Sequence, residues 1–435
     1  MLAPVRTRAT STPGPTAPSG AFSSALLASA SVVATGLNYL FLVAAGRLLG
    51  NEDYGELAAL LGLLTVVLLP TGAVQLAVSR EVSRRLALGE ADEAHAFTWA
   101  TLRLGLVVTV PLAVVAFAFV VPIRELLNID STAAVTLAAA GVVVALILPI
   151  TIGVLQGYQR FPATAALYVL PFALRLVLLA AVAVWAENRV GGAMFAAVGG
   201  ALLSAGVALW LVRGPMRLGA RMPRPDLRPF LHYLWPVVVG LIGIALLTNG
   251  DILVVKARFS ADDAGDYAAA SAFARVAFFL PATVLAVLFP RTAARQARGE
   301  DTADILGRSL IVTAVFCALL AGAFALVGDT LVRLSFGAEF ADAGEILPEL
   351  AVAMMFFSLA NVLVGFHLSR GETRYAWIVA VAVVVQMVVL ATIPSSLEQV
   401  VWADILVGIA LLAAHELLVG SSVPALRAGL RRMRG

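Results

Sequence analysis

Three charged side chains, Arg175, Asp251 and Arg275, lie deep within long apolar stretches of the sequence. A charge at the centre of a bilayer costs about 2.5–3.5 kcal/mol on insertion scales, so an ionisable residue there is a functional candidate by default. Asp251 and Arg275 flank a turn expected near residue 262. Because a helix rises about 1.5 Å per residue, the two side chains reach similar depths, and we expect them to lie close enough to interact.

The expected Asp251–Arg275 pair has two interpretations that the sequence leaves open. In one, a permanent ion pair compensates two buried charges. In the other, Arg275 engages an anionic substrate and releases Asp251 to accept a proton or Na⁺. Arg175 has no acidic residue at its depth, which makes it the better candidate for a free cation in a water-filled cavity.

Two asparagines occupy corresponding positions in the two halves of the chain. Asn38 and Asn249 lie 211 positions apart, each in the first apolar segment of its half. They predict a polar seam facing the partner half, with hydrogen bonding between helices as the alternative. His367 and His415 are expected near cytoplasmic helix ends, at the membrane interface.

The elements that position these residues are apolar segments of about 20 residues, enough to span a bilayer core. The 435-residue chain is 61% hydrophobic and 13% charged, whereas soluble domains carry roughly a quarter charged residues. The segments are continuous rather than alternating, which excludes a barrel. The pattern predicts an all-α polytopic membrane protein with twelve helices, at about 22–46, 55–79, 98–121, 133–156, 164–186, 192–213, 231–256, 267–290, 306–328, 347–369, 375–396 and 399–420.

The distribution of the 30 basic residues sets the orientation. The termini and the loops after even-numbered helices hold 21 of them, and the loops after odd-numbered helices hold 6. This bias predicts that both termini are cytoplasmic. The expected divisions are a disordered tail (1–20), an N-lobe of six helices (21–213), a cytoplasmic Arg/Pro linker (214–230), a C-lobe of six helices (231–425) and a basic tail (426–435).

The two halves repeat each other. "LGNEDYGELAAL" (49–60) aligns with "FSADDAGDYAAA" (259–270) at an offset of 210 residues. Six helices per half is an even number, so both copies enter the membrane from the same side. The repeats are therefore expected to be parallel, related by a pseudo-two-fold axis along the membrane normal.

A Gly-x-x-Arg-aromatic turn also occurs twice, in "QGYQRF" and "RGETRY". Each copy is expected to close the cytoplasmic end of the fourth helix of its half. Glycine would permit the reversal, arginine would meet phosphate headgroups, and the aromatic residue would sit at the interface. A structural role is favoured over substrate contact for all six residues: Gly157, Arg160, Phe161, Gly371, Arg374 and Tyr375.

Several chemistries are excluded by absent motifs. No P-loop occurs, since the residue immediately before Lys256, the only lysine, is not glycine. The single cysteine, Cys317, allows no internal disulfide, and no spacing indicates a metal site. No nucleophile elbow is present. We therefore expect no enzyme, cofactor or metal, and the membrane-proximal basic residues favour anionic lipids over nucleic acid as partners.

The chain resembles the polysaccharide-exporter and lipid-linked oligosaccharide flippase branch of the multidrug/oligosaccharidyl-lipid/polysaccharide superfamily. The resemblance covers residues 21 to 425 and is carried by "RLLGNEDYGELAAL", "DILVVKARFSADDAGDYAAASAFARV", "LQGYQRF" and "LSFGAEFADAGEIL". It implies two lobes around a cavity that opens alternately to each face of the cytoplasmic membrane. It also implies a polyprenyl-diphosphate-linked glycan as substrate, and a polysaccharide polymerase or glycosyltransferases as partners.

The resemblance implies roles for individual residues. The arginine of "AASAFARV", Arg275, recurs in this family, and with Arg175 it is expected to meet the diphosphate. Asn38 and Asn249 are expected nearer the sugars. Without an ATPase motif, the energy source stays open between an ion gradient, the membrane potential and consumption of the product.

Three alternatives remain. A multidrug/cation antiporter of the same superfamily would favour deep acidic residues, and a count of two deep arginines to one deep aspartate argues against it. A membrane glycosyltransferase or ligase could use Glu52 and Asp53, but this acidic pair recurs at Asp262 and Asp263 and so belongs to the repeat. A scaffold of a glycan-synthesis complex is the third. The glycan, the lipid carrier, the coupling ion and the oligomeric state are left open.

Overall fold

The computed structural model describes residues 20–183, 189–213, 228–278, 292, 295, 300–340, 342–372 and 374–434. The expected disordered tail and most of the Arg/Pro linker lie outside these residues. So does the second half of the eighth expected helix. Within the described residues every regular element is a helix.

The helices of the N-terminal half follow one another with short connections. They are α1 (Gly20–Leu49), α2 (Asn51–Leu68), α3 (Thr71–Ala87), α4 (Ala91–Ala118), α5 (Val120–Leu126), α6 (Thr132–Gly141), η1 (Val142–Val144), α7 (Ile147–Gly157), α8 (Phe161–Val182) and α9 (Arg189–Leu211).

The C-terminal half is built in the same way. Its described helices are α10 (Arg228–Arg258), α11 (Ala261–Ala274), α13 (Ala303–Ser335), η2 (Ala338–Phe340), α14 (Ala343–Ser369), α15 (Arg374–Thr392), α16 (Leu397–Leu418) and α17 (Ser422–Arg434). Across both halves, eleven described segments are long and apolar enough to cross a membrane.

Two expected helices are interrupted in the structure. The second, expected over 55–79, is divided into α2 and α3 by a turn at Leu69–Pro70, because proline cannot donate the backbone hydrogen bond that continues a helix. The fourth, expected over 133–156, is divided into α6, η1 and α7. The single 3₁₀ turn of η1 redirects the chain without ending the span.

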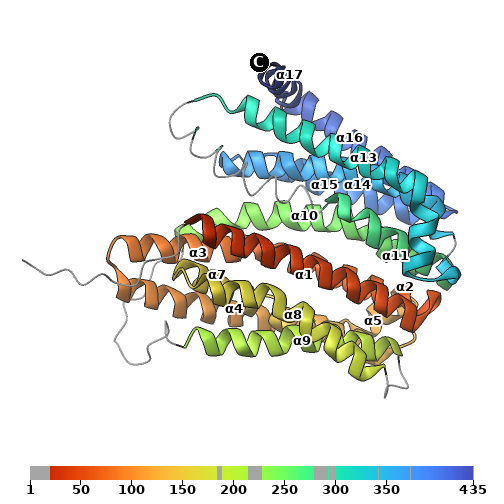
Figure 1. Ribbon diagram of the computed structural model, residues 1–435, viewed down its shortest axis with the longest axis horizontal. Helices are drawn as coiled ribbons and strands as arrows, with labels where there is room; N and C mark the ends of the chain where they lie inside the picture. Colours follow the sequence, from red (N-terminus) through yellow and green to blue (C-terminus); the bar gives the residue numbers. More distant parts are fainter. Residues whose placement is uncertain are drawn as a thin grey trace, which may run out of the picture.

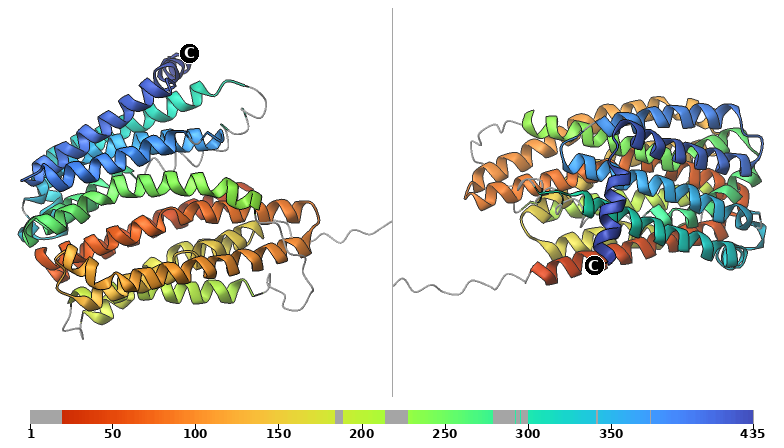
Figure 2. Two further views of the ribbon diagram at one scale, coloured as in Figure 1. Left: turned by 180° about the vertical axis from the view of Figure 1, so that it is seen from behind. Right: turned by 90° about the horizontal axis from the view of Figure 1, so that it is seen from above.

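The helices form two lobes, with α1–α9 below and α10–α17 above in Figure 1, and the same separation in the reverse view of Figure 2. In the N-lobe, α8 packs against α9 and α1, and α3 packs against α7. In the C-lobe, α14 packs against α13 and α16, and α10 packs against α15. This is the two-lobe, all-helical architecture that the sequence predicts.

The lobes meet where α2 crosses α11. A Cβ added at Gly55 would lie 3.0 Å from the backbone of Ala264 and Gly265, and one at Gly265 would overlap the backbone of Asn51. Gly55 and Gly265 are equivalent at the repeat offset of 210. The repeat thus supplies both halves of a close helix crossing, as expected at an interface between two-fold related surfaces. We term this end of the molecule, which includes Leu49–Gly55 and Phe259–Gly265, the closed end.

Polar contacts between the lobes also gather at the closed end. Lys256 Nζ of α10 lies 3.7 Å from Glu56 Oε1 of α2, and both side chains are buried. Asn51 Nδ2 donates to the Glu339 carbonyl at 3.0 Å, and Asn128 Nδ2 donates to the Ala257 carbonyl at 3.1 Å. A buried ion pair between lobes is costly to break on one side only, so this cluster holds the end shut.

The repeated turn motif is used differently in its two copies. Gly371 has a φ of 75°, as a turn glycine should, but in the first copy the left-handed residue is Gln159. Gly157 is needed instead for packing, since a Cβ there would lie 2.6 Å from Val82 Cβ. Tyr375 is fully buried against His367 and His415, and its expected position at the membrane interface stays a prediction. Arg160 and Arg374 are exposed.

Candidate functional site

A cavity of about 520 Å³ lies between the lobes. Its walls come mainly from α1, α2 and α8, with smaller contributions from α7 and α9 and, in the C-lobe, from α10, α11, Arg275 and Phe278. It extends from Tyr54, near the closed end, to Gln75 and Tyr168. Of the described residues that line it, Arg175 and Arg275 are the only charged ones. The structure therefore places both deep arginines on the wall of one cavity, and their contact with a substrate stays a prediction.

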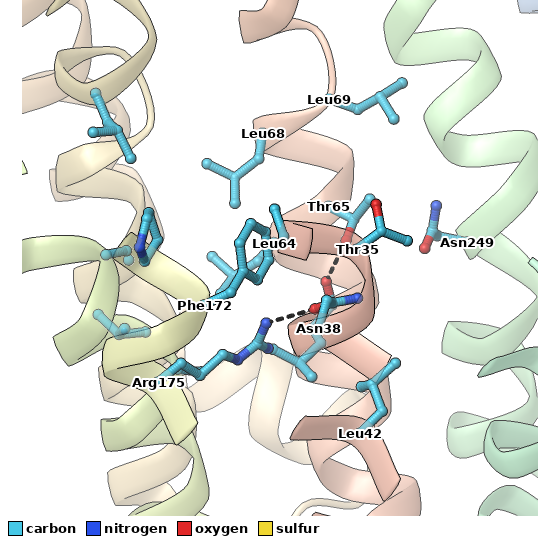
Figure 3. Close-up of a pocket in the computed structure, with 18 of the residues that line it drawn as sticks. Thr35, Asn38, Leu42, Leu64, Thr65, Leu68, Leu69, Phe172, Arg175 and Asn249 are labelled. Atoms are coloured by element: carbon cyan, nitrogen blue, oxygen red, sulfur yellow. Dashed lines mark hydrogen bonds between the residues drawn. The ribbon is translucent and has the colours of Figure 1, made fainter. Parts of the chain in front are cut away.

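Arg175 crosses the cavity from α8 towards α1 (Figure 3). Its Nη1 donates to Asn38 Oδ1 at 2.9 Å, and its guanidinium lies 3.8 Å from the centre of the Phe41 ring. Nε has no hydrogen-bond partner, and no described carboxylate forms an ion pair with this residue. A fixed cation without a counter-charge is suited to meet an anionic ligand.

Asn249 reaches the cavity from the opposite lobe, in the direction of Thr35 in Figure 3. Its Nδ2 donates to the Ala245 carbonyl and to Thr248 Oγ1, both at 3.0 Å. Both asparagines predicted for a polar seam therefore line the cavity, one bound to Arg175 and the other to its own helix. Their contact with a substrate stays a prediction.

Arg275 connects the cavity to the interior of the C-lobe. It lines the cavity, and its Nη2 lies 3.9 Å from Asp251 Oδ1, so the predicted proximity of these two residues is present. Neither Nη2 nor Nε of Arg275 makes a hydrogen bond, and Asp251 Oδ1 makes none either. This is a long, loosely formed pair rather than a bidentate one, and a competing anion in the cavity could displace it.

A buried polar network continues from Asp251 into the C-lobe. The Tyr267 hydroxyl donates to Asp251 Oδ2 at 2.7 Å and lies 3.4 Å from Asp404 Oδ2. Gln386 Nε2 donates to Asp404 Oδ1 at 2.7 Å and to the Leu247 carbonyl at 3.0 Å. All four side chains are buried, and Arg275 is the only described cation paired with either carboxylate.

Asp404 was missed by the sequence reasoning, although a carboxylate inside the apolar run of α16 was a sufficient signal. The omission makes one sequence argument wrong. With Asp404 included, the deep charged residues are two arginines and two aspartates. Their ratio therefore no longer argues against a multidrug/cation antiporter.

A second polar cluster, also missed, lies in the N-lobe at the end of the cavity away from the closed end. Gln75 Nε2 and Gln156 Nε2 both donate to the Tyr168 hydroxyl oxygen, at 2.9 and 2.7 Å. Gln75 and Tyr168 line the cavity. Neutral amides and hydroxyls carry no hydropathy signal strong enough to separate them from ordinary helix contacts.

The two histidines lie near the ends of α14 and α16, as expected, and both are buried among side chains. His367 Nε2 and His415 Nε2 lie 2.9 Å apart, His367 Nδ1 bonds to Glu372 Oε2 at 2.7 Å, and His415 Nδ1 bonds to Ser422 Oγ at 2.7 Å. The pair joins α14 and α16 to the start of α17, away from the cavity lining. The two histidines are 48 residues apart, so local sequence patterns could not predict their contact.

Solved structures with the same fold are membrane transporters by their descriptions. The lipid II flippase MurJ in an inward closed conformation matches with a TM-score of 0.69 at 11% identity, covering 94% of this chain and 90% of that one. An inward-facing multidrug resistance MATE family transporter of the MOP superfamily matches at 0.66 and 13%, covering 93% and 98%. The eukaryotic MATE transporter AtDTX14 matches at 0.68 and 15%, covering 94% and 98%.

Sequence comparison supplies the family. No curated protein matched the chain. The family model described as "Polysaccharide biosynthesis protein" matches residues 23–296, which is more than half of the chain and includes the whole N-lobe, the closed end and Arg275. The chain therefore belongs to the polysaccharide biosynthesis protein family and has the fold of the MOP superfamily.

Proposed function

We propose that this protein is a flippase that moves a polyprenyl-diphosphate-linked oligosaccharide, or a related lipid-linked glycan, from the cytoplasmic to the outer leaflet for cell-surface polysaccharide export. The observation that carries the proposal is a cavity between two lobes whose described charged lining is cationic only. A diphosphate cannot cross hydrocarbon unaided, and it needs cations along its path. The family description and the fold shared with a lipid II flippase support the same substrate class.

The closed end suggests how the cavity would open alternately to the two sides of the membrane. With Gly55 and Gly265 in contact, the cavity is shut beyond Tyr54, and the orientation expected from the basic residues puts this end outside. Separation of α2 from α11 would expose the cavity to the exterior, with each lobe moving as a unit. The protein binds and releases the glycan without forming or breaking its bonds, and we place it in the cytoplasmic membrane.

The buried acids provide a coupling site. Asp251 and Asp404 share Tyr267, and Arg275 balances one negative charge at most. Two carboxylates close together in a low-dielectric interior require a second positive charge, which a proton or Na⁺ would supply. When Arg275 turns to the diphosphate, the network gains affinity for that cation, and transport becomes linked to an ion gradient.

An ion-coupled multidrug antiporter is the second candidate, and the buried acid network is the observation that favours it. The two candidates differ in the charge of their cargo, because a cavity with two arginines repels a cationic drug. The glycosyltransferase alternative is not favoured, because its acidic pair, Glu52 and Asp53, recurs at Asp262 and Asp263 and belongs to the repeat at the closed end, outside the cavity lining.

The test is transport in proteoliposomes with an undecaprenyl-diphosphate-linked monosaccharide, measured by enzymatic access to the outer leaflet. Arg175→Ala is expected to lower the initial rate at least about tenfold, since one lost charge-assisted contact is worth about 1.5–3 kcal/mol. Arg103→Ala is the matched control, because Arg103 is exposed on α4 beside Trp99, away from the cavity. Equal rates for wild type and Arg175→Ala, or transport of a cationic dye alone, would contradict the proposal.

A further inference from the structure

The N-lobe cluster of Gln75, Gln156 and Tyr168 has an arrangement that helix packing alone does not require. Both amides donate to the Tyr168 oxygen, which fills its two acceptor positions. Among the described residues, nothing accepts the Tyr168 hydroxyl proton and nothing donates to Gln75 Oε1. One donor and one acceptor therefore stand side by side at the cavity wall.

The backbone holds this cluster in place. A Cβ at Gly153 of α7 would lie 2.5 Å from the Gln75 carbonyl oxygen, so only glycine allows α3 and α7 to approach so closely. The break at Pro70 turns α3 so that Thr71 and Gln75 both reach the cavity. Gln156 is absent from the lining and acts through Tyr168, which makes it a positioning residue.

The cluster lies at a defined level relative to the arginine. Tyr168 and Arg175 are seven residues apart on α8, which places them on the same face and about 10 Å apart along the helix. Apart from Arg175 and Arg275 the described lining is uncharged, and it includes Thr71 and Gln75 of α3, Leu148, Pro149 and Ile152 of α7 and Leu167 of α8. The cavity thus has a cationic level and, two helical turns away, a neutral polar level.

We propose that Gln75 and Tyr168 form a subsite for a neutral sugar of the glycan, beyond the one bonded to the diphosphate. A sugar hydroxyl donates and accepts at once, so an adjacent donor and acceptor recognise it, and a neutral ligand needs no charge at this level. The first sugar is bonded directly to the phosphate and stays near Arg175; the next one reaches the cluster. The subsite makes the protein selective for glycan length, and this inference rests on the proposed flippase function.

The experiment compares two probes in proteoliposomes, undecaprenyl diphosphate carrying one sugar and the same lipid carrying two. Tyr168→Phe removes the donated hydrogen bond and keeps the ring, and Gln75→Leu removes the acceptor. Each is expected to raise KM for the two-sugar probe about fivefold to tenfold, in line with about 1 kcal/mol for a neutral hydrogen bond, with kcat and the one-sugar KM unchanged. Gln156→Leu is expected to raise the same KM less, because Gln156 orients Tyr168 and Gln75 by hydrogen bonds but does not line the cavity itself.

Tyr158→Phe is the control, since Tyr158 is a half-buried tyrosine of the same lobe that stacks on His95 outside the cavity lining. Equal effects of Tyr168→Phe on both probes, or an effect on neither, would overturn the subsite while leaving the flippase intact. A wild-type protein that moves neither probe would instead overturn the proposed function.

Discussion

The two lobes bury their polar residues in different places. The N-lobe presents Arg175, Asn38 and the Tyr168 cluster on the cavity wall. The C-lobe seals Asp251 and Asp404 inside its own helices. Arg275 alone belongs to both settings, as it lines the cavity and pairs with Asp251.

This difference indicates a division of labour within a duplicated fold. The repeat is kept where the lobes meet, at Gly55 and Gly265, and differs in the polar residues buried in each lobe. In the proposed function, the N-lobe recognises the headgroup and the C-lobe compensates charge, with Arg275 linking the two. The predictions below test each side of this comparison.

The largest effect on stability and transport is expected for Arg275, which lines the cavity and pairs with Asp251. Arg275→Ala should leave Asp251 buried without a cation, and breaking one side of a buried pair costs about 3–5 kcal/mol. We expect a large loss of thermal stability in detergent together with loss of flipping. The double variant Arg275→Ala/Asp251→Asn removes both charges and should recover most of the stability but none of the transport. Recovery of both would mean that Arg275 serves only to neutralise Asp251.

A smaller effect is expected at the closed end. Lys256→Gln leaves Glu56 unpaired between the lobes and should favour their separation. The probe is a cysteine in place of Ala58, which is buried near Tyr54 on the cavity wall, in a protein whose Cys317 is replaced by serine. An impermeant maleimide should label this cysteine about tenfold faster with Lys256→Gln than without it, equivalent to about 1.4 kcal/mol. Arg258→Gln is the control, because Arg258 donates to Leu390 within its own lobe. Faster labelling in both would show general loosening instead.

Asp404→Asn tests the C-lobe network. It should keep the fold, because an amide can still pair with Gln386 and Tyr267, but it removes one negative charge. Transport against a substrate gradient should fall about tenfold in the presence of an ion gradient, while downhill exchange stays within about twofold. Asp329→Asn, an exposed aspartate on α13, is the comparison variant. Unchanged uphill transport in Asp404→Asn would remove the acids from the coupling scheme.

The smallest effect concerns pH at the closed end. Burial and the neighbouring Asp342 carboxylate raise the pKa of Asp266 to about 7, and Asp266 lies on α11 just before the eighth expected span, 267–290. Between the usual carboxyl value of about 3.9 and about 7, the folded protein holds a proton that the unfolded chain releases. Stability should therefore fall as pH rises from 5 to about 7 and then lose this dependence. Asp266→Asn should flatten the slope in thermal unfolding; an unchanged slope would exclude this residue.

The sequence predicted the fold well and the site in part. Spans of about 20 apolar residues and the 210-residue repeat were enough for two helical lobes, because the bilayer allows few alternatives. Arg175, Arg275 and Asp251 were found because charge in an apolar run is a strong signal. Asp404 carried the same signal and was overlooked.

Other features could not be predicted because they depend on contacts between distant segments. Gln75 and Tyr168 are 93 residues apart, and their meeting depends on the break at Pro70 and on the space that Gly153 leaves. Gly157 looked like a turn residue, yet its function is set by Val82, which belongs to another helix. Local patterns do not record such neighbours.

The central claim, that the glycan headgroup occupies the cavity between the lobes, is tested most directly by photo-crosslinking. A benzophenone amino acid in place of Phe172, which lines the cavity beside Arg175, should capture an undecaprenyl-diphosphate-linked glycan, and the yield should fall when Arg175 is also replaced by alanine. The same substitution at Phe117, exposed on the outer surface of α4, should give little capture. Equal capture at both positions, or a yield at Phe172 that is indifferent to Arg175, would contradict the account.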